Sequence, residues 1–118
     1  MRMNFARAVL AAGVLGSAAG ISLGVAFAES GDTAVNIKDF NFGPKSVTVK
    51  AGTVVTWTNQ DDIPHNVTST TKQFRSKALD TDDKFTFTFS TPGTYNYFCT
   101  LHPQMTGTIV VVAADATP

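Results

Sequence analysis

Hydrophobic and polar residues alternate along several short runs of this chain, and a period of two is typical of β-strands. The clearest run spans residues 85–89, where three phenylalanines alternate with two threonines. Successive side chains of a strand point to opposite faces of its sheet, so the phenylalanines share one face. We expect this run to form a central strand.

Six further runs, rich in valine, threonine and aromatic residues, predict strands at 34–40, 46–50, 54–59, 65–69, 94–98 and 107–112. Turn-forming residues such as Gly43-Pro44 and Pro92-Gly93 separate them. Seven to eight short strands predict an all-β fold, a two-sheet Greek-key β-sandwich whose antiparallel sheets pack face to face. The segment 70–83 mixes charges and predicts a long exposed connection or a short irregular strand. The predicted core comprises Val47, Val49, Trp57, Phe85, Phe87, Phe89, Ile109 and Val111.

The first 28 residues have the composition of a secretory signal peptide. Arg2 and Arg7 precede an uncharged stretch, 8–27, and small residues flank Phe27. We therefore expect cleavage after Ala28 and a mature domain at 29–118, located in the periplasm or otherwise outside the cytoplasmic membrane. The alternative is an uncleaved membrane anchor, because the uncharged stretch approaches the length that spans a bilayer. Its many glycines and serines favour the signal peptide.

The mature domain is small and nearly neutral. Removing Arg2 and Arg7 leaves seven basic against nine acidic side chains, a formal charge of −2, and implies no nucleic-acid partner. We expect a monomer. Exported domains of this size often depend on disulfides or a metal. Cys99 is the only cysteine, so an internal disulfide is impossible and the thiol requires another explanation.

Cys99, His102 and Met105 follow one another at intervals of three residues. Pro103 argues against a helix, so we expect a strand ending at Cys99 and a loop that turns back into 107–112. Strand ends gather at one end of a sandwich, where His65 can meet this loop. Thiolate, two imidazoles and a thioether form the ligand set expected of a trigonal copper site with a long axial methionine bond.

Each of these residues also has an ordinary explanation. A single histidine such as His65 is more often a surface residue, Met105 alone would be core filling, and a free cysteine usually behaves as a small hydrophobic residue. The chain, however, places both of its histidines and its only cysteine in one arrangement. A shared metal site accounts for all of them, and a structural zinc site is the alternative metal.

Three motifs occur in a fixed order: V-V-T-W-T-N, I-P-H-N-V and P-G-T-Y-N-Y-F-C-T-L-H-P-Q-M-T-G-T-I-V-V. Together they resemble the cupredoxin family, blue copper proteins, over roughly the whole mature domain. The Cys-x-x-His-x-x-Met loop is most similar to the short ligand loop of amicyanin, within the plastocyanin-like group. One departure is Leu101, where relatives often have proline.

The resemblance implies one type 1 copper ion, bound by Nδ1 of His65 and His102, by the Cys99 sulfur and axially by Met105. It further implies that Asn66 directs its backbone N–H to the thiolate and its side chain toward Thr100. The implied function is that of a one-electron carrier cycling between Cu(II) and Cu(I). Redox partners would dock transiently at an apolar patch around His102, formed by Leu101 and Pro103.

Two other functions are possible for such a domain. Some copper oxidases and nitrite reductases contain one, but catalysis there needs a second, histidine-rich copper site, and no histidine remains. We therefore expect no enzymatic activity. A copper chaperone favours open, methionine-rich sites, whereas the other methionines here, Met1 and Met3, lie in the expected signal peptide.

Overall fold

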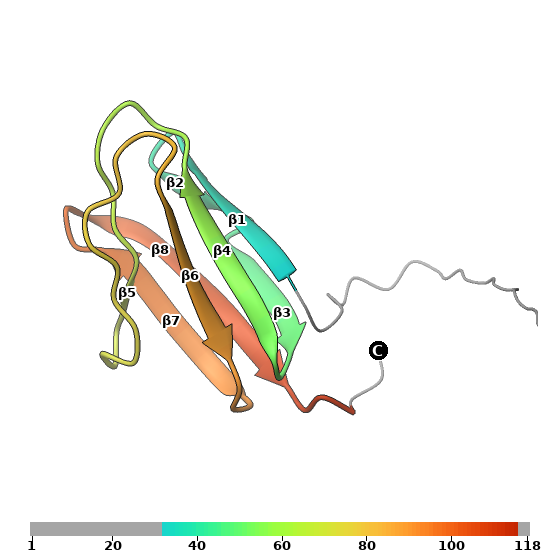
Figure 1. Ribbon diagram of the computed structural model, residues 1–118. Coiled ribbons are helices and arrows are strands. Elements are labelled where there is room, and N and C mark those ends of the chain that lie inside the picture. The colour runs from blue at the N-terminus through green and yellow to red at the C-terminus, as the bar shows by residue number, and fades with distance from the viewer. Residues whose placement is uncertain (1–31, 116–118) are drawn as a thin grey trace, which may run out of the picture.

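The computed structural model describes residues 32–115, which form two four-stranded sheets packed against each other (Figure 1). The strands are β1 (Asp32–Lys38), β2 (Asn41–Gly43), β3 (Ser46–Lys50), β4 (Thr53–Asn59), β5 (Thr68–Ser69), β6 (Lys84–Phe89), β7 (Gly93–Cys99) and β8 (His102–Val112). One sheet has the order β2-β1-β4-β6 and the other β3-β8-β7-β5. The predicted all-β sandwich is confirmed. The expected signal peptide, 1–28, lies outside the described residues.

Each sheet is mixed rather than antiparallel, so that part of the prediction was wrong. β1 pairs with β4 in parallel, and β3 pairs with β8 in parallel. The chain reaches β4 from β1 by way of β2 and then β3, which belongs to the opposite sheet. A connection through the other sheet lets two strands run in the same direction, whereas a tight hairpin makes them antiparallel.

The phenylalanine strand β6 lies at the edge of its sheet, not in the centre as predicted. It pairs only with β4, so Phe85 and Phe87 are half-buried while Phe89 is buried. The period-two pattern indicates which face of a strand is buried, but not how many neighbours the strand has. The other predicted core residues pack as expected, with Val47 only partly buried.

The segment between β5 and β6 is less exposed than predicted. Phe74 and Leu79 are buried in the core, and isolated bridges join Thr68 to Arg75 and His65 to Leu79. The segment therefore acts as an irregular strand along much of its length. His65 pairs with this segment only through a single bridge. Of the predicted strand 65–69, therefore, only β5 is a regular strand.

β7 and β8 approach each other closely where Tyr97 faces Gly107. A Cβ atom at Gly107 would lie 2.3 Å from Cζ of Tyr97, so only glycine fits there. Burial raises the pKa of Tyr97 to about 12. The nearby Trp57 indole lowers the pKa of Tyr97, but less than burial raises it. The Trp57 Nε1 and the Tyr97 hydroxyl do not form a hydrogen bond of regular geometry. Tyr97 is thus a neutral part of the core, two residues before Cys99.

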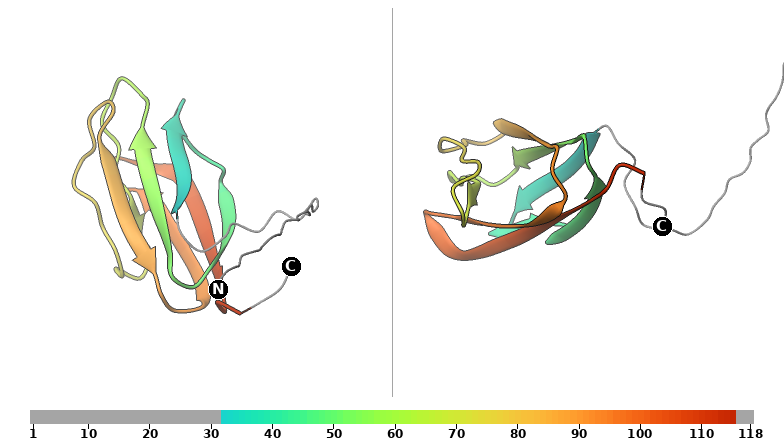
Figure 2. Two further views of the ribbon diagram at one scale, coloured as in Figure 1. Left: turned by 45° about the vertical axis from the view of Figure 1, so that its right-hand side comes forward. Right: turned by 90° about the horizontal axis from the view of Figure 1, so that it is seen from below.

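The described chain begins and ends at one end of the sandwich, and the turn between β7 and β8 lies toward the other end (Figures 1 and 2). Loops following β4 and preceding β6 gather at that far end with the β1–β2 turn. Segments distant in sequence can therefore meet there. Within residues 32–115, no helix is long and apolar enough to cross a membrane.

Candidate metal centre

The structure brings His65, Cys99 and His102 together as predicted. Their ligand atoms lie within 4.8 Å of one another. The Cys99 Sγ is 3.8 Å from Nδ1 of His65 and 3.7 Å from Nδ1 of His102. His65 and Cys99 are fully buried, whereas His102 is half-buried. One ring therefore reaches the surface while the rest of the cluster is enclosed.

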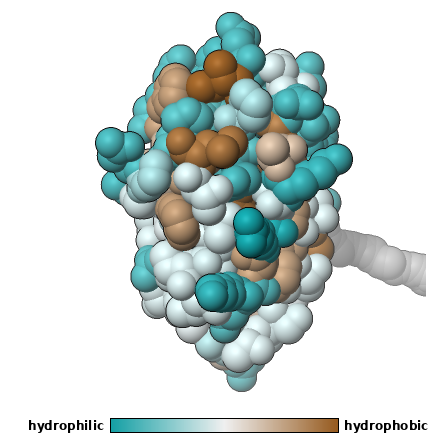
Figure 3. Space-filling model, turned by 90° about the vertical axis from the view of Figure 1, so that its left-hand side faces the viewer, coloured by the Kyte–Doolittle hydropathy of each residue, from teal (hydrophilic) through white to brown (hydrophobic). Residues whose placement is uncertain are grey.

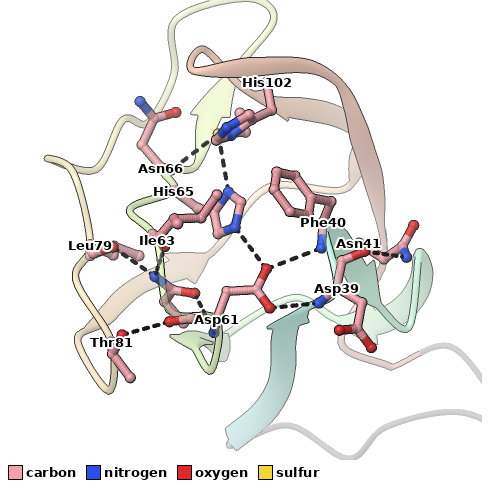
Figure 4. A network of polar contacts seen from close by, with 12 residues as sticks. Asp39, Phe40, Asn41, Asp61, Ile63, His65, Asn66, Leu79, Thr81 and His102 are labelled. Carbon is pink, nitrogen blue, oxygen red and sulfur yellow. Dashed lines mark hydrogen bonds and ion pairs between the residues drawn. The ribbon is translucent and has the colours of Figure 1, made fainter.

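A carboxylate binds the buried His65 ring on the side opposite Cys99. Oδ2 of Asp61 lies 2.8 Å from Nε2 of His65, and Asp61 itself is only 8% exposed (Figure 4). The same carboxylate accepts hydrogen bonds from the backbone N–H groups of Asp39 at 2.7 Å and Phe40 at 3.0 Å. One side chain thus connects His65 to the β1–β2 turn.

The state of Asp61 determines the tautomer of His65. Burial raises the pKa of this carboxyl, but hydrogen bonds from Phe40, Asp39 and His65 outweigh burial and hold the pKa below its ordinary value of 3.8. A carboxylate only accepts hydrogen bonds, so Nε2 of His65 carries the proton. In the neutral ring Nδ1 then keeps a free lone pair, and this is the nitrogen that faces Cys99.

A compact turn places Asp61 and His65 relative to each other. The buried side chain of Asn59 donates to the carbonyls of Ile63 and Leu79 and accepts from the N–H of Asp61. The backbone of His65 is paired in both directions with Leu79, at 3.2 and 2.7 Å. Because both its backbone and its Nε2 are bound, the His65 ring has little freedom to rotate.

Asn66 makes the contacts expected of it. Its backbone N–H lies 3.4 Å from the Cys99 sulfur, and its side chain bonds Thr100 twice, through Oγ1 at 2.6 Å and through the backbone N–H at 2.8 Å. This N–H donor helps to fix the position of the Cys99 sulfur. The pair with Thr100 joins the two chain segments that supply the ligand atoms.

The predicted loop from Cys99 to Met105 proved shorter. β8 already begins at His102, and Cys99 pairs with it directly. The register then jumps, because Phe98 pairs with Thr106, so Pro103 and the two residues after it bulge from the ladder. A bulge tolerates proline and redirects side chains. Met105 is 4% exposed and buried at the end of this bulge.

Comparisons with known proteins agree with this geometry. The model of the cupredoxin-like domain matches residues 7–111. The chain belongs to the cupredoxin family. Amicyanin-alpha of Methylorubrum extorquens is 39% identical over 111 residues, which cover 90% of this cupredoxin and 87% of the relative.

Two solved structures are also similar. The purple cupredoxin of Nitrosopumilus maritimus has a TM-score of 0.64 and 31% identity, with 67% of this chain and 98% of that chain covered. A copper-containing nitrite reductase of Thermus scotoductus has the same TM-score and 28% identity, but the match covers only 22% of its chain, against 67% of this one. This cupredoxin therefore resembles one part of that enzyme.

The donor atoms suit a copper ion. Metal bonds of about 2.0–2.3 Å to nitrogen and sulfur place neighbouring donors about 3.5–3.8 Å apart, and the two sulfur–nitrogen distances here are 3.8 and 3.7 Å. A thiolate with two imidazoles is the trigonal set typical of type 1 copper. Copper is the cofactor that this family and this cluster indicate.

Sequence reasoning missed Asp61, Asn59 and Phe40. For Asp61 there is a usable signal, a carboxylate four residues before the candidate ligand His65. Phe40 gave no signal, because its contact with the site depends on how the β1–β2 turn folds.

We expect Asn66→Ala to lower copper affinity by about tenfold or more, because partners of metal ligands typically contribute 10–100-fold. The variant keeps the N–H donor to Cys99 and loses the two side-chain bonds to Thr100 and the one that Oδ1 accepts from Thr68 Oγ1 at 3.3 Å. Competition with a chelator of known affinity measures the change. Gln104→Ala, an exposed position in the β8 bulge after His102, is the control. Equal copper affinities for both variants would contradict a role for Asn66.

Proposed function

We propose that this cupredoxin is an exported one-electron carrier that holds one type 1 copper ion between His65, Cys99, His102 and Met105. The observation that carries the proposal is the cluster of two Nδ1 atoms around the buried Cys99 sulfur. When bound, copper supplies one-electron chemistry by alternating between Cu(II) and Cu(I). The protein residues supply a fixed geometry.

The side chains around the cluster favour rapid electron transfer because they are held in advance. Asp61 and Leu79 fix His65, while Asn66 holds the Cys99 sulfur and Thr100. Met105, buried at the end of the bulge, would contribute a weak thioether donor. Donors that do not move need little reorganisation when the charge of the site changes, which is the same principle as electrostatic preorganisation in enzymes.

Electrons would enter and leave through His102, the half-buried member of the cluster. Leu101 beside it is 51% exposed and Pro103 is also exposed. On the face that carries the β7–β8 turn, hydrophobic residues form separate small patches among hydrophilic ones (Figure 3). A small apolar patch suits brief docking of redox partners, in keeping with weak electron-transfer complexes.

The proposal includes no enzymatic activity for this chain. Catalytic copper proteins of this kind need a second metal site rich in histidine, and both histidines of the chain already belong to one cluster. Nitrite or oxygen turnover by the purified protein would contradict this part of the proposal.

Export is proposed from the composition of residues 1–28, with cleavage after Ala28. Mass spectrometry of the exported protein should then find Glu29 at its N-terminus. A product that retains residues 1–28 would indicate a membrane anchor instead.

The optical spectrum of the purified protein tests the copper site directly. Adding one equivalent of Cu(II) should produce an intense blue absorption from thiolate-to-copper charge transfer, and reduction should remove it. Zinc should occupy the same donors without colour. A protein that bound Cu(II) with only weak absorption would not be the carrier proposed here.

A further inference from the structure

Phe40 occupies an unusual position in the β1–β2 turn. It has a φ of 60° and follows Asp39, whose φ is 53°. Consecutive non-glycine residues in the left-handed region are uncommon and strained. Two hydrogen bonds from their N–H groups to Asp61 compensate for the strain. The turn is therefore held in a conformation that the chain would not adopt alone.

This conformation directs the Phe40 ring onto the metal centre rather than into the core. Its centroid lies 5.3 Å from the His65 ring and 4.9 Å from the His102 ring, nearly perpendicular to both. The two imidazoles are 4.9 Å apart, so the three rings form a triangle. Figure 4 shows Phe40 beside His65, and the dashed lines from Asp61 lead to the His65 ring and to the backbone of the β1–β2 turn.

Core packing does not account for Phe40, because 49% of the residue remains exposed. Phe40 and Leu101 are the two exposed large hydrophobic residues of the described chain. Leu101 is adjacent to His102 in sequence, whereas Phe40 comes from a separate turn that is bound in place. An exposed phenylalanine held in a strained turn against two imidazoles indicates a role at the site.

We propose that Phe40 is a positioning residue that caps the metal centre. It restrains the His65 and His102 rings by edge-on aromatic contacts, and it limits the access of water and small anions to the enclosed Cys99 sulfur. The inference rests on the proposed function only in taking this cluster to be the metal site. Asp61 supports the cap and His65 together, so a variant of Asp61 would not separate the two roles.

The first test uses the metal-free protein and therefore does not depend on copper. Cys99 is fully buried, so its alkylation by iodoacetamide reports how readily the site opens. Phe40→Ala should raise the alkylation rate by about tenfold, and Phe40→Leu, which keeps volume but lacks the aromatic contacts, by less. Gln104→Ala, an exposed position in the bulge after His102 with no role at the site, is the control and should react like the unaltered protein.

The second test uses the copper-loaded protein and azide as the probe anion. Phe40→Ala should show a saturable change in the visible spectrum with millimolar azide, whereas the unaltered protein and Gln104→Ala should not. Circular dichroism confirms that each variant is folded. The cap is overturned if Phe40→Ala matches the unaltered protein in both tests, or if Gln104→Ala responds as strongly. Absence of blue colour in the unaltered protein would instead refute the proposed function, leaving the alkylation result to decide the cap.

Discussion

Replacing Cys99 by serine is expected to abolish the intense visible absorption of the copper-loaded protein and most of its copper retention. The absorption depends on charge transfer from a thiolate, and Cys99 is the only cysteine of the chain. Serine has almost the same shape, but its hydroxyl does not ionise at neutral pH and is a hard donor, unlike the thiolate that copper prefers. Titration with Cu(II), followed by dialysis against a chelator, measures both losses.

Met105→Leu is the matched control for Cys99→Ser. It removes the proposed axial donor and keeps a buried apolar side chain of similar volume. Because the axial bond is weak, this variant should remain blue, with a shifted spectrum and an altered reduction potential. Thermal unfolding of both metal-free variants verifies that they are folded. Retention of full absorption by Cys99→Ser would rule out the thiolate as a ligand.

The candidate ligand residues could be proposed from sequence because their chemistry is distinctive and their spacing is local. Cys99, His102 and Met105 lie within seven residues, and His65 is the only other histidine. The sandwich itself followed from the period-two pattern of short strands. No property of the residues 85–89, however, distinguishes a central strand from an edge strand, because that depends on pairings between distant segments.

The supporting residues were harder to predict for the same physical reason. Asp61 meets Asp39 and Phe40 across 22 and 21 positions of the chain, and only the folded β1–β2 turn creates these contacts. A left-handed pair without glycine has no simple sequence signature. Asn66 was predictable only through the family resemblance, because an asparagine after a histidine is otherwise ordinary turn polarity.

The apolar core between the two sheets centres on Trp57. Truncating this side chain is expected to destabilise the fold strongly. Trp57 is fully buried on β4, and its ring lies 5.9 Å from Phe74, 5.6 Å from Phe85 and 5.4 Å from Tyr97, centroid to centroid. These partners come from strands of both sheets and from the segment between β5 and β6. The Trp57 side chain thus joins the two sheets, including β7, the strand that ends at Cys99.

Trp57→Ala is expected to lower the free energy of unfolding of the metal-free protein by about 3–5 kcal/mol, the usual cost of truncating a buried tryptophan. Small domains have only about 5–15 kcal/mol of stability, so the melting temperature should fall by roughly 15–30 °C. Urea denaturation followed by circular dichroism is the appropriate measurement, because Trp57 is the only tryptophan and its fluorescence disappears with it.

Trp57→Phe removes the indole nitrogen with a much smaller loss of volume than Trp57→Ala. Phenylalanine keeps an aromatic ring between the sheets and removes Nε1, which has no hydrogen-bond partner within residues 32–115. A buried donor without a partner is itself unfavourable, so this variant should lose only about 1–2 kcal/mol. If Trp57→Phe proved as unstable as Trp57→Ala, the indole nitrogen rather than the packed ring would be the stabilising group, and the two sheets would depend on a polar contact at their centre.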